Sequence, residues 1–169
     1  MPYVQNLTAQ HIAPKGGGFE PQRKNNFTIS LPVGGNVLVQ SLESCPLPVE
    51  ENEVIAIKYG NETRKVAGPA TFSDLAVTIK DFIDSPVIQQ LMSWRRKVYD
   101  PASGVIKLAS GYKENGSIVM FGPDGSHARK WTIEGVWPSK VDPGSGNMGE
   151  GGNNMISVTL QIDRAFSPA

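Results

Sequence analysis

"MISVTLQIDRAF", residues 155–166, is the stretch of the sequence that decides the fold. Apolar and polar side chains alternate along it, and a period of two residues is typical of a β-strand with one buried and one wet face. The apolar face carries Ile156, Val158, Leu160 and Ile162. The polar face carries Ser157, Thr159, Gln161 and Asp163. The stretch predicts the closing strand of a sheet that is buried on one side.

Shorter stretches with the same alternation occur through most of the chain. Residues 27–31 and 36–43, joined by a turn at 32–35, predict a β-hairpin. Residues 53–68 and 72–82 predict further strands. Residues 116–137 predict a hairpin around a Pro-Asp-Gly turn, which has the chemistry that such turns need.

"TIEGVWPSKV", residues 132–141, alternates in the same way up to Trp137 and Pro138. Proline has no backbone N–H to donate to a sheet, so it is rare inside central strands. We therefore expect this strand to end at Trp137-Pro138, with the aromatic ring packed as an anchor.

One segment has a strong helical pattern, "DSPVIQQLMSWRRKVYDP". Ser85 can cap a helix and Pro86 suits its first position, so the pattern predicts a helix over residues 86–100. The face expected to pack comprises Ile88, Leu91, Met92, the stem of Arg95, Val98 and Tyr99. Six to eight strands with one packed α-helix predict a mainly β fold, a barrel or a sandwich.

The chain of 169 residues has room for one domain of ordinary size. Residues 1–26 are dense in glycine, proline and polar side chains, which predicts an N-terminal arm before a single β-rich domain at 27–169. The glycine-rich stretch 142–154 predicts a long loop between two strands, and loops of that length are usually functional.

Charge and cysteine content exclude several classes of protein. Lysine plus arginine and aspartate plus glutamate each total 16, so no net charge steers the chain toward DNA or an anionic membrane. Cys45 is the single cysteine and is expected to be a small buried hydrophobe rather than a reactive thiol. The sequence has no signal-peptide pattern and no membrane-spanning segment, so we expect a soluble protein of a reducing cytoplasm.

The sequence contains no group of residues typical of a catalytic site. His11 and His127 lack partners at metal-ligand spacing, and neither has a nucleophile motif beside it. The glycine-rich stretches 16–24 and 143–154 lack the strand, helix and lysine of a phosphate loop. We therefore expect no catalytic residues, no cofactor and no metal, and the two-faced strands favour a structural protein that pairs with copies of itself.

The order of several motifs resembles the tail tube proteins of contractile-tailed bacteriophages. The resemblance rests on "LESCPLPVEENEVIAIKYGNETRKVAGPATFSDLAVTIKDF", "IQQLMSWRR", "IEGVWPSKV" and "NNMISVTLQIDRAF". The matching positions are a Leu-Pro turn at Leu47-Pro48, then Lys65, Gly68, Phe72, Leu75 to Ile79, Trp94, Gly135, Trp137, Pro138, Val158 and Leu160. Of these, Gly68, Phe72, Trp94, Trp137 and Pro138 are expected to be architectural.

The resemblance implies a tail-tube-like fold and a structural role in the virion. Hexameric rings would stack into a hollow tail tube inside a sheath, after assembly in the host cytoplasm. The implied partners are copies of the chain itself, the tail sheath protein, baseplate and tail terminator proteins, the tape measure protein and DNA. Ser157, Thr159, Gln161 and Asp163 are the lumen-facing candidates, because DNA that must slide without specific binding needs a surface free of lysine and arginine stripes.

A long hairpin at 45–66 is expected to cover neighbouring subunits, because it carries apolar residues on both faces. The ring and stacking interface candidates are Leu47, Pro48, Val54, Ile55, Ile57, Tyr59, Arg64 and Lys65.

Three alternative functions stay open. The first is the inner tube of a related contractile machine, such as a pyocin, an extracellular injection system or a type VI secretion system. The others are a monomeric ligand-binding β-barrel and a small hydrolase on a β-sandwich.

Overall fold

The computed structural model describes residues 24–31, 42–84, 86–122, 125, 127–146, 148–149 and 151–167. Most of the predicted arm 1–26, and with it His11, lies outside these residues. The strands are β1 (Phe27–Ser30), β2 (Leu42–Ser44), β3 (Glu50–Tyr59), β4 (Glu62–Phe72), β5 (Leu75–Lys80), β6 (Tyr99–Asp100), β7 (Val105–Ile106), β8 (Glu114–Phe121), β9 (His127–Asp142), β10 (Met155–Gln161) and β11 (Arg164–Phe166). The helices are α3 (Val87–Val98) and a short 3-10 turn, η1 (Ala109–Gly111).

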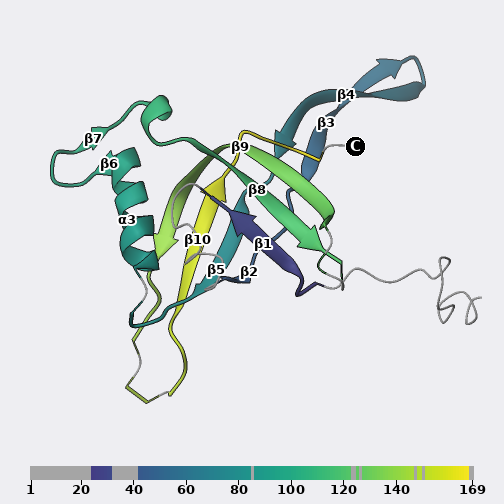
Figure 1. Cartoon of the computed structure of the whole chain (residues 1–169). Coiled ribbons are helices and arrows are strands. Elements are labelled where there is room, and N and C mark those ends of the chain that lie inside the picture. The colour runs from purple at the N-terminus through teal and green to yellow at the C-terminus, as the bar shows by residue number, and fades with distance from the viewer. Residues whose placement is uncertain are drawn as a thin grey trace, which may run out of the picture.

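A curled antiparallel sheet forms the body of the molecule (Figure 1). Its strand order is β1-β8-β9-β10-β5-β2, and β11 pairs with β9 beside β10. Two separate ribbons, β3–β4 and β6–β7, project from opposite sides of this body. The prediction of a mainly β fold with one packed helix is confirmed.

The predicted end of a strand at Trp137-Pro138 is wrong, because β9 continues through both residues to Asp142. Pro138 lies opposite Leu160, where the register between β9 and β10 shifts. A shift of this kind removes the regular ladder locally, so the missing N–H of proline costs little there. A second irregularity lies near Gly135, which has a φ of +67°. The long strand bends around these two points, and the sheet curls with it.

The closing stretch 155–166 is interrupted in the middle. β10 ends at Gln161 and the chain bends at Ile162 and Asp163 before β11 begins. Both segments nevertheless pair with β9, β10 through Gln161↔Trp137 and β11 through Arg164↔Glu134. The break therefore lies beside Gly135, so β9 and its neighbour bend at the same level.

The helix begins one residue later and ends two residues earlier than predicted. Pro86 is the N-cap residue and its carbonyl accepts the Gln90 N–H at 3.0 Å, whereas Ser85 lies outside the described residues. Tyr99 and Asp100 belong to β6. The buried helix residues are Val87, Leu91, Trp94 and Val98. The predicted face was therefore wrong in part, because Ile88, Met92 and Arg95 are half-buried and Tyr99 is exposed.

The core lies on the apolar face of the curled sheet. Its members from the sheet include Ile29, Leu75, Val77, Ile79, Ile118, Ile133, Val136, Ile156, Val158 and Leu160. Val87, Leu91 and Trp94 of the helix join the same cluster. Among the described residues, no helix is long and apolar enough to cross a membrane.

The turn at 32–35 and residues 36–41 of the first predicted hairpin lie outside the described residues. The strand at 27–31 pairs with β8, and the described end of the predicted second strand, which begins β2, pairs with β5. The second predicted hairpin differs in its bounds. The long hairpin exists, but it spans residues 50–72 rather than 45–66, because β4 continues past Gly68 to Phe72.

Candidate functional site

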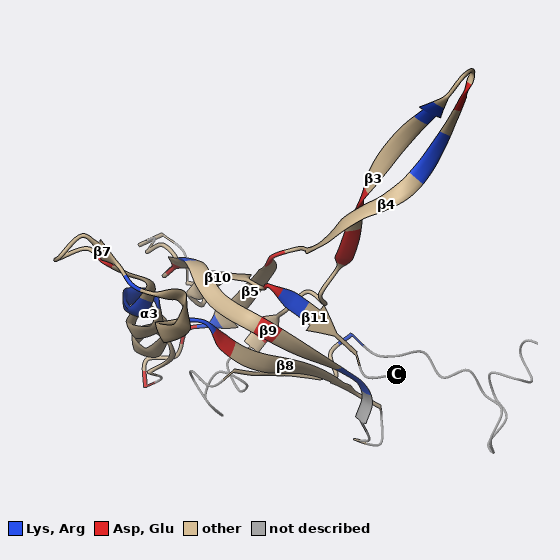
Figure 2. Cartoon of the chain, turned by 90° about the horizontal axis from the view of Figure 1, so that it is seen from above, with Lys and Arg blue, Asp and Glu red and all other residues tan. Residues whose placement is uncertain are grey.

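The β3–β4 hairpin leaves the body of the molecule as a free two-stranded ribbon (Figure 2). Every residue of β3 is exposed, and so is nearly all of β4. The exposed large apolar side chains include Val54, Ile55, Ile57, Tyr59 and Val66, with Val54 62% exposed and Tyr59 61% exposed. An isolated ribbon of two strands is only marginally stable in water, and such an apolar surface is typical of a protein contact.

The register of the hairpin sorts its side chains onto two faces. Ile55 lies opposite Val66 and Ile57 opposite Arg64, so one face is mainly apolar. Near the tip of this face the Arg64 guanidinium lies 5.2 Å from the centre of the Tyr59 ring. The other face pairs Val54 with Ala67, Ala56 with Lys65 and Lys58 with Thr63. Seven of the eight predicted interface residues are on or beside this ribbon and exposed, and Pro48 is half-buried.

Gly68 and Phe72 hold the base of the hairpin. A Cβ atom at Gly68 would lie 3.1 Å from both the Cβ and the carbonyl oxygen of Glu53, at the point where the β3–β4 register shifts. Phe72 is half-buried against the core, and the Ser73 N–H donates to the carbonyl of Val49 at 3.1 Å. The ribbon is therefore anchored at one end and free along its length.

Charge is separated along the ribbon, as Figure 2 shows. The segment that leads into and begins β3 is acidic, and we name it the acidic base; it comprises Leu47, Val49, Glu50, Glu51 and Glu53. All five side chains are exposed. The tip carries the cations Lys58, Arg64 and Lys65 beside Glu62.

The polar face of the sheet carries three of the four predicted lumen residues. Ser157, Thr159 and Gln161 alternate with the buried Ile156, Val158 and Leu160 along β10. Their cross-strand neighbours on β5 are Thr78 and Ala76. Their neighbours on β9 are Asp142, Lys140 and Trp137.

Two lysines on this face have carboxylate partners. The Lys80 ammonium lies 2.7 Å from the Glu43 carboxylate, and the Lys140 ammonium lies 3.7 Å from that of Asp142. Both pairs are exposed, so each contributes little to stability. Because the paired charges largely cancel, the two lysines add little positive potential to this face.

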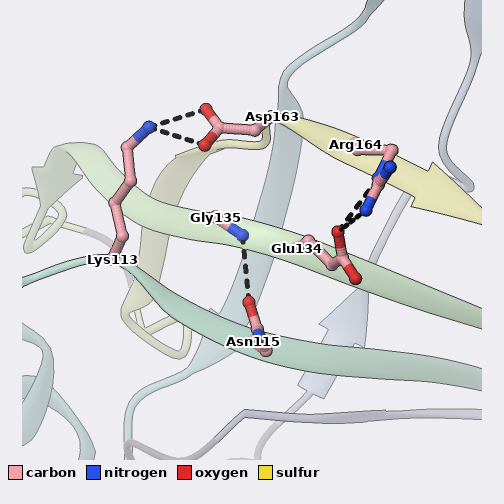
Figure 3. Close-up of polar contacts among 6 residues, drawn as sticks. All are labelled: Lys113, Asn115, Glu134, Gly135, Asp163 and Arg164. Atoms are coloured by element: carbon pink, nitrogen blue, oxygen red, sulfur yellow. Dashed lines mark hydrogen bonds and ion pairs between the residues drawn. The ribbon is translucent and has the colours of Figure 1, made fainter. Parts of the chain in front are cut away.

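Asp163, the fourth lumen candidate, takes part in a clamp at the bend of β9 (Figure 3). Its carboxylate accepts two hydrogen bonds from the Lys113 ammonium, at 2.8 and 2.6 Å. Its backbone N–H donates to the Glu134 carbonyl at 3.0 Å. On the other side of β9, the Asn115 side chain accepts the Gly135 N–H at 3.2 Å. Arg164 pairs with the Glu134 carboxylate beside them.

Trp94 and Trp137 are linked through Tyr112. The Trp94 Nε1–H donates to the Tyr112 carbonyl at 2.8 Å, and the Tyr112 ring meets Trp137 edge to face at 5.6 Å. Such an aromatic pair adds roughly 1 kcal/mol beyond the area that it buries. The sequence indicated both tryptophans as anchors but gave no reason to include Tyr112.

Cys45 is half-buried and packs against the core. Burial raises the pKa of its thiol from 9.0 to about 12, so it is a poor nucleophile.

In the loop after β9, the Asn154 side-chain amide donates to Asp81 at 3.1 Å and to the Pro143 carbonyl at 2.9 Å. One amide therefore ties the described base of this loop to the end of β5.

A further surface was not identified from the sequence. The β6–β7 ribbon and the end of α3 expose Val105, Ile106 and Leu108 next to three cations, Arg96, Lys97 and Lys107. We name these six residues the cationic end. Asp100 is the single carboxylate between residues 95 and 108, and hydrogen bonds from the Ala102 N–H and the Ser103 hydroxyl hold its pKa below the ordinary value. The short run "VIKL" was too brief to be recognised as a surface feature.

Known structures share this fold. The chain matches a structure described as the anti-feeding prophage cap, a tube terminating cap, with a TM-score of 0.72 at 13% identity, covering 93% of this chain and 97% of that one. It also matches the PVC sheath–tube complex of an extracellular contractile injection system, with a TM-score of 0.68 at 15% identity, covering 100% and 99%. The chain therefore shares its fold with proteins in structures of contractile injection machinery.

The family described as T4-like virus tail tube protein gp19 matches residues 23–165, which is most of the chain. The chain belongs to this family of tail tube proteins. No curated protein sequence matches it.

Proposed function

We propose that this protein forms hexameric rings that stack into the inner tail tube of a contractile phage, through which DNA passes. The observation that carries the proposal is the β3–β4 hairpin, which is mainly apolar on the face of Ile55, Ile57 and Val66 and is exposed along the whole of β3. A tail tube protein needs contacts with copies of itself, and this ribbon leaves Val54, Ile55, Ile57, Tyr59 and Val66 exposed.

The sheet supports the proposal in a second way. β1 and β2 end the strand order, and each has one strand partner among the described residues. Unpaired strand edges readily pair with another chain. Pairing of such edges around a ring would give a continuous barrel, with Ser157, Thr159 and Gln161 on the face toward the lumen. Asp163 is held by Lys113 at the margin of this face.

The proposed partners follow from the same assembly. The tail sheath protein would surround the tube, baseplate and terminator proteins would bind its ends, and the tape measure protein and DNA would occupy the lumen without specific binding. A second candidate is the same structural role in a phage-related injection machine, because the matched structures are described as an anti-feeding prophage and an extracellular contractile injection system.

The test is electron microscopy of purified protein at rising concentration, with light scattering to give the mass. We expect rings or hollow tubes with a six-fold end view. Replacement of residues 51–71 by a short turn should leave a folded protein that stays as monomers or single rings. Long normal tubes from this variant would contradict the proposed role of the hairpin. Wild-type protein that never assembles, with or without preformed tube seeds, would contradict the proposed function itself.

A further inference from the structure

We propose that the cationic end of one copy binds the acidic base of the hairpin of a second copy. This inference rests on the proposed function and assigns the two surfaces that meet when copies assemble. The cationic end comprises Arg96, Lys97, Val105, Ile106, Lys107 and Leu108, and the acidic base comprises Leu47, Val49, Glu50, Glu51 and Glu53, as defined above.

The two surfaces are complementary in charge. Residues 47–53 contain three carboxylates and no cation. The cationic end carries three exposed cations, and the one carboxylate between residues 95 and 108, Asp100, accepts hydrogen bonds within its own turn. Opposite charges on facing patches favour one pairing and disfavour others, since like charges would meet in the wrong register.

Each surface also offers apolar side chains to bury. Ile106 is 74% exposed and Leu108 is 81% exposed, and on the other side Val49 is 55% exposed. Exposed aliphatic side chains at the centre of a patch with charges around them are the usual composition of a contact between proteins. The charges alone would be screened at physiological salt, so the apolar part is needed for a stable contact.

The positions of the two surfaces explain why the occupant is a second copy. In Figures 1 and 2 the β6–β7 ribbon and α3 lie on one side of the sheet, and the β3–β4 hairpin leaves from the other. The cationic end therefore lies far from its own chain's acidic base. Complementary patches on opposite sides of one molecule produce a head-to-tail contact, which closes into a ring or continues as a helical stack.

A pair of charge reversals tests this contact. In one variant, Arg96→Glu and Lys107→Glu make the cationic end acidic. In the other, Glu50→Lys and Glu53→Lys make the acidic base basic. Each variant alone then brings like charges together, and we expect the concentration needed for assembly to rise at least tenfold, because like-charge juxtaposition at a contact costs several kcal/mol.

Mixing the two variants is the sharper measurement. In an equimolar mixture, each contact between unlike variants pairs opposite charges, so assembly should return with the two chains alternating. Lys24→Glu with Lys130→Glu is the matched control for the cationic-end variant, because it changes the net charge by the same amount and in the same direction at exposed positions outside both surfaces. Circular dichroism checks that each variant is folded.

The outcomes separate the two proposals. If the wild type assembles and both reversal variants assemble equally well, this contact is overturned and the proposed function stands. The same holds if the variants lose assembly and mixing them does not restore it. Wild-type protein that does not assemble even on tube seeds would overturn the proposed function, and the contact with it.

Discussion

The carboxylate of Asp163 occupies the space in which a side chain at Gly135 would have to lie. Gly135 also has a φ of +67°, which favours glycine. The bend of β9 therefore depends on a glycine for two independent reasons, one from the backbone and one from a residue that is close only in the folded chain. The curl of the sheet depends on this bend.

Substitution Gly135→Ala should destabilise the protein by about 2–5 kcal/mol, since it combines left-handed backbone strain with a clash against Asp163. Urea unfolding followed by circular dichroism measures the change. Gly104→Ala is the matched control, because Gly104 has a φ of +70° and nothing near its missing Cβ. It should cost only about 1–2 kcal/mol. Equal losses at the two sites would show that the Asp163 contact has no energetic effect.

Trp94→Phe should lower stability by roughly 2–3 kcal/mol. The variant loses part of a fully buried ring and leaves the Tyr112 carbonyl without its hydrogen bond, and both changes are costly. Thermal unfolding should show a fall in Tm of about 5–10 °C for a chain of this size. Trp131→Phe, at a half-buried position at the edge of the core, is the control and should change Tm much less. A similar loss from both variants would argue against a special role for the Trp94 bond.

Some features of the fold can be predicted from a local sequence pattern, and others cannot. Ile156 to Gln161 alternate because one sheet face is buried, and a period of two residues records this directly. The interruption at Asp163 is different, because it depends on Gly135, which lies 28 residues earlier in the chain and pairs with the same region. No short-range pattern contains that relationship, so the strand was predicted to run unbroken.

The helix illustrates the same limit. Val87, Leu91, Trp94 and Val98 are spaced as a helical face, but so are Ile88, Met92, Arg95 and Tyr99. Which of the two faces is buried depends on the sheet against which the helix packs. It also depends on the Tyr112 carbonyl, which accepts the hydrogen bond from Trp94. The long hairpin was predicted because it carries apolar residues on both faces, whereas the cationic end was missed because β6 and β7 have only two residues each.

Cys45 should react slowly with thiol reagents while the protein is folded. Its pKa is raised to about 12 by burial, so at pH 8 the thiolate fraction is more than about 100-fold below that of an unfolded cysteine. Burial favours the neutral thiol, so its contribution to the free energy of unfolding is fully present below the ordinary pKa of 9.0. This contribution is lost as the pH rises from 9.0 toward 12. Labelling rates with and without urea measure the difference, with Cys45→Ala as the blank. Equal rates in both conditions would contradict the burial of the thiol.

Thr159→Lys should convert the proposed lumen into a surface that retains DNA. Thr159 lies in the middle of the polar face of β10, next to Lys140, whose charge is offset by Asp142. An added lysine without a partner would repeat in every copy around a ring, and phosphate contacts strengthen steeply as such cations accumulate. Assembled tubes of the variant should hold DNA at about 0.1 M salt and release it near 0.5 M, whereas wild-type tubes should hold none. Thr159→Glu controls for damage to assembly and should also hold none. Variant tubes that assemble normally and still fail to retain DNA would place this face elsewhere than in the lumen.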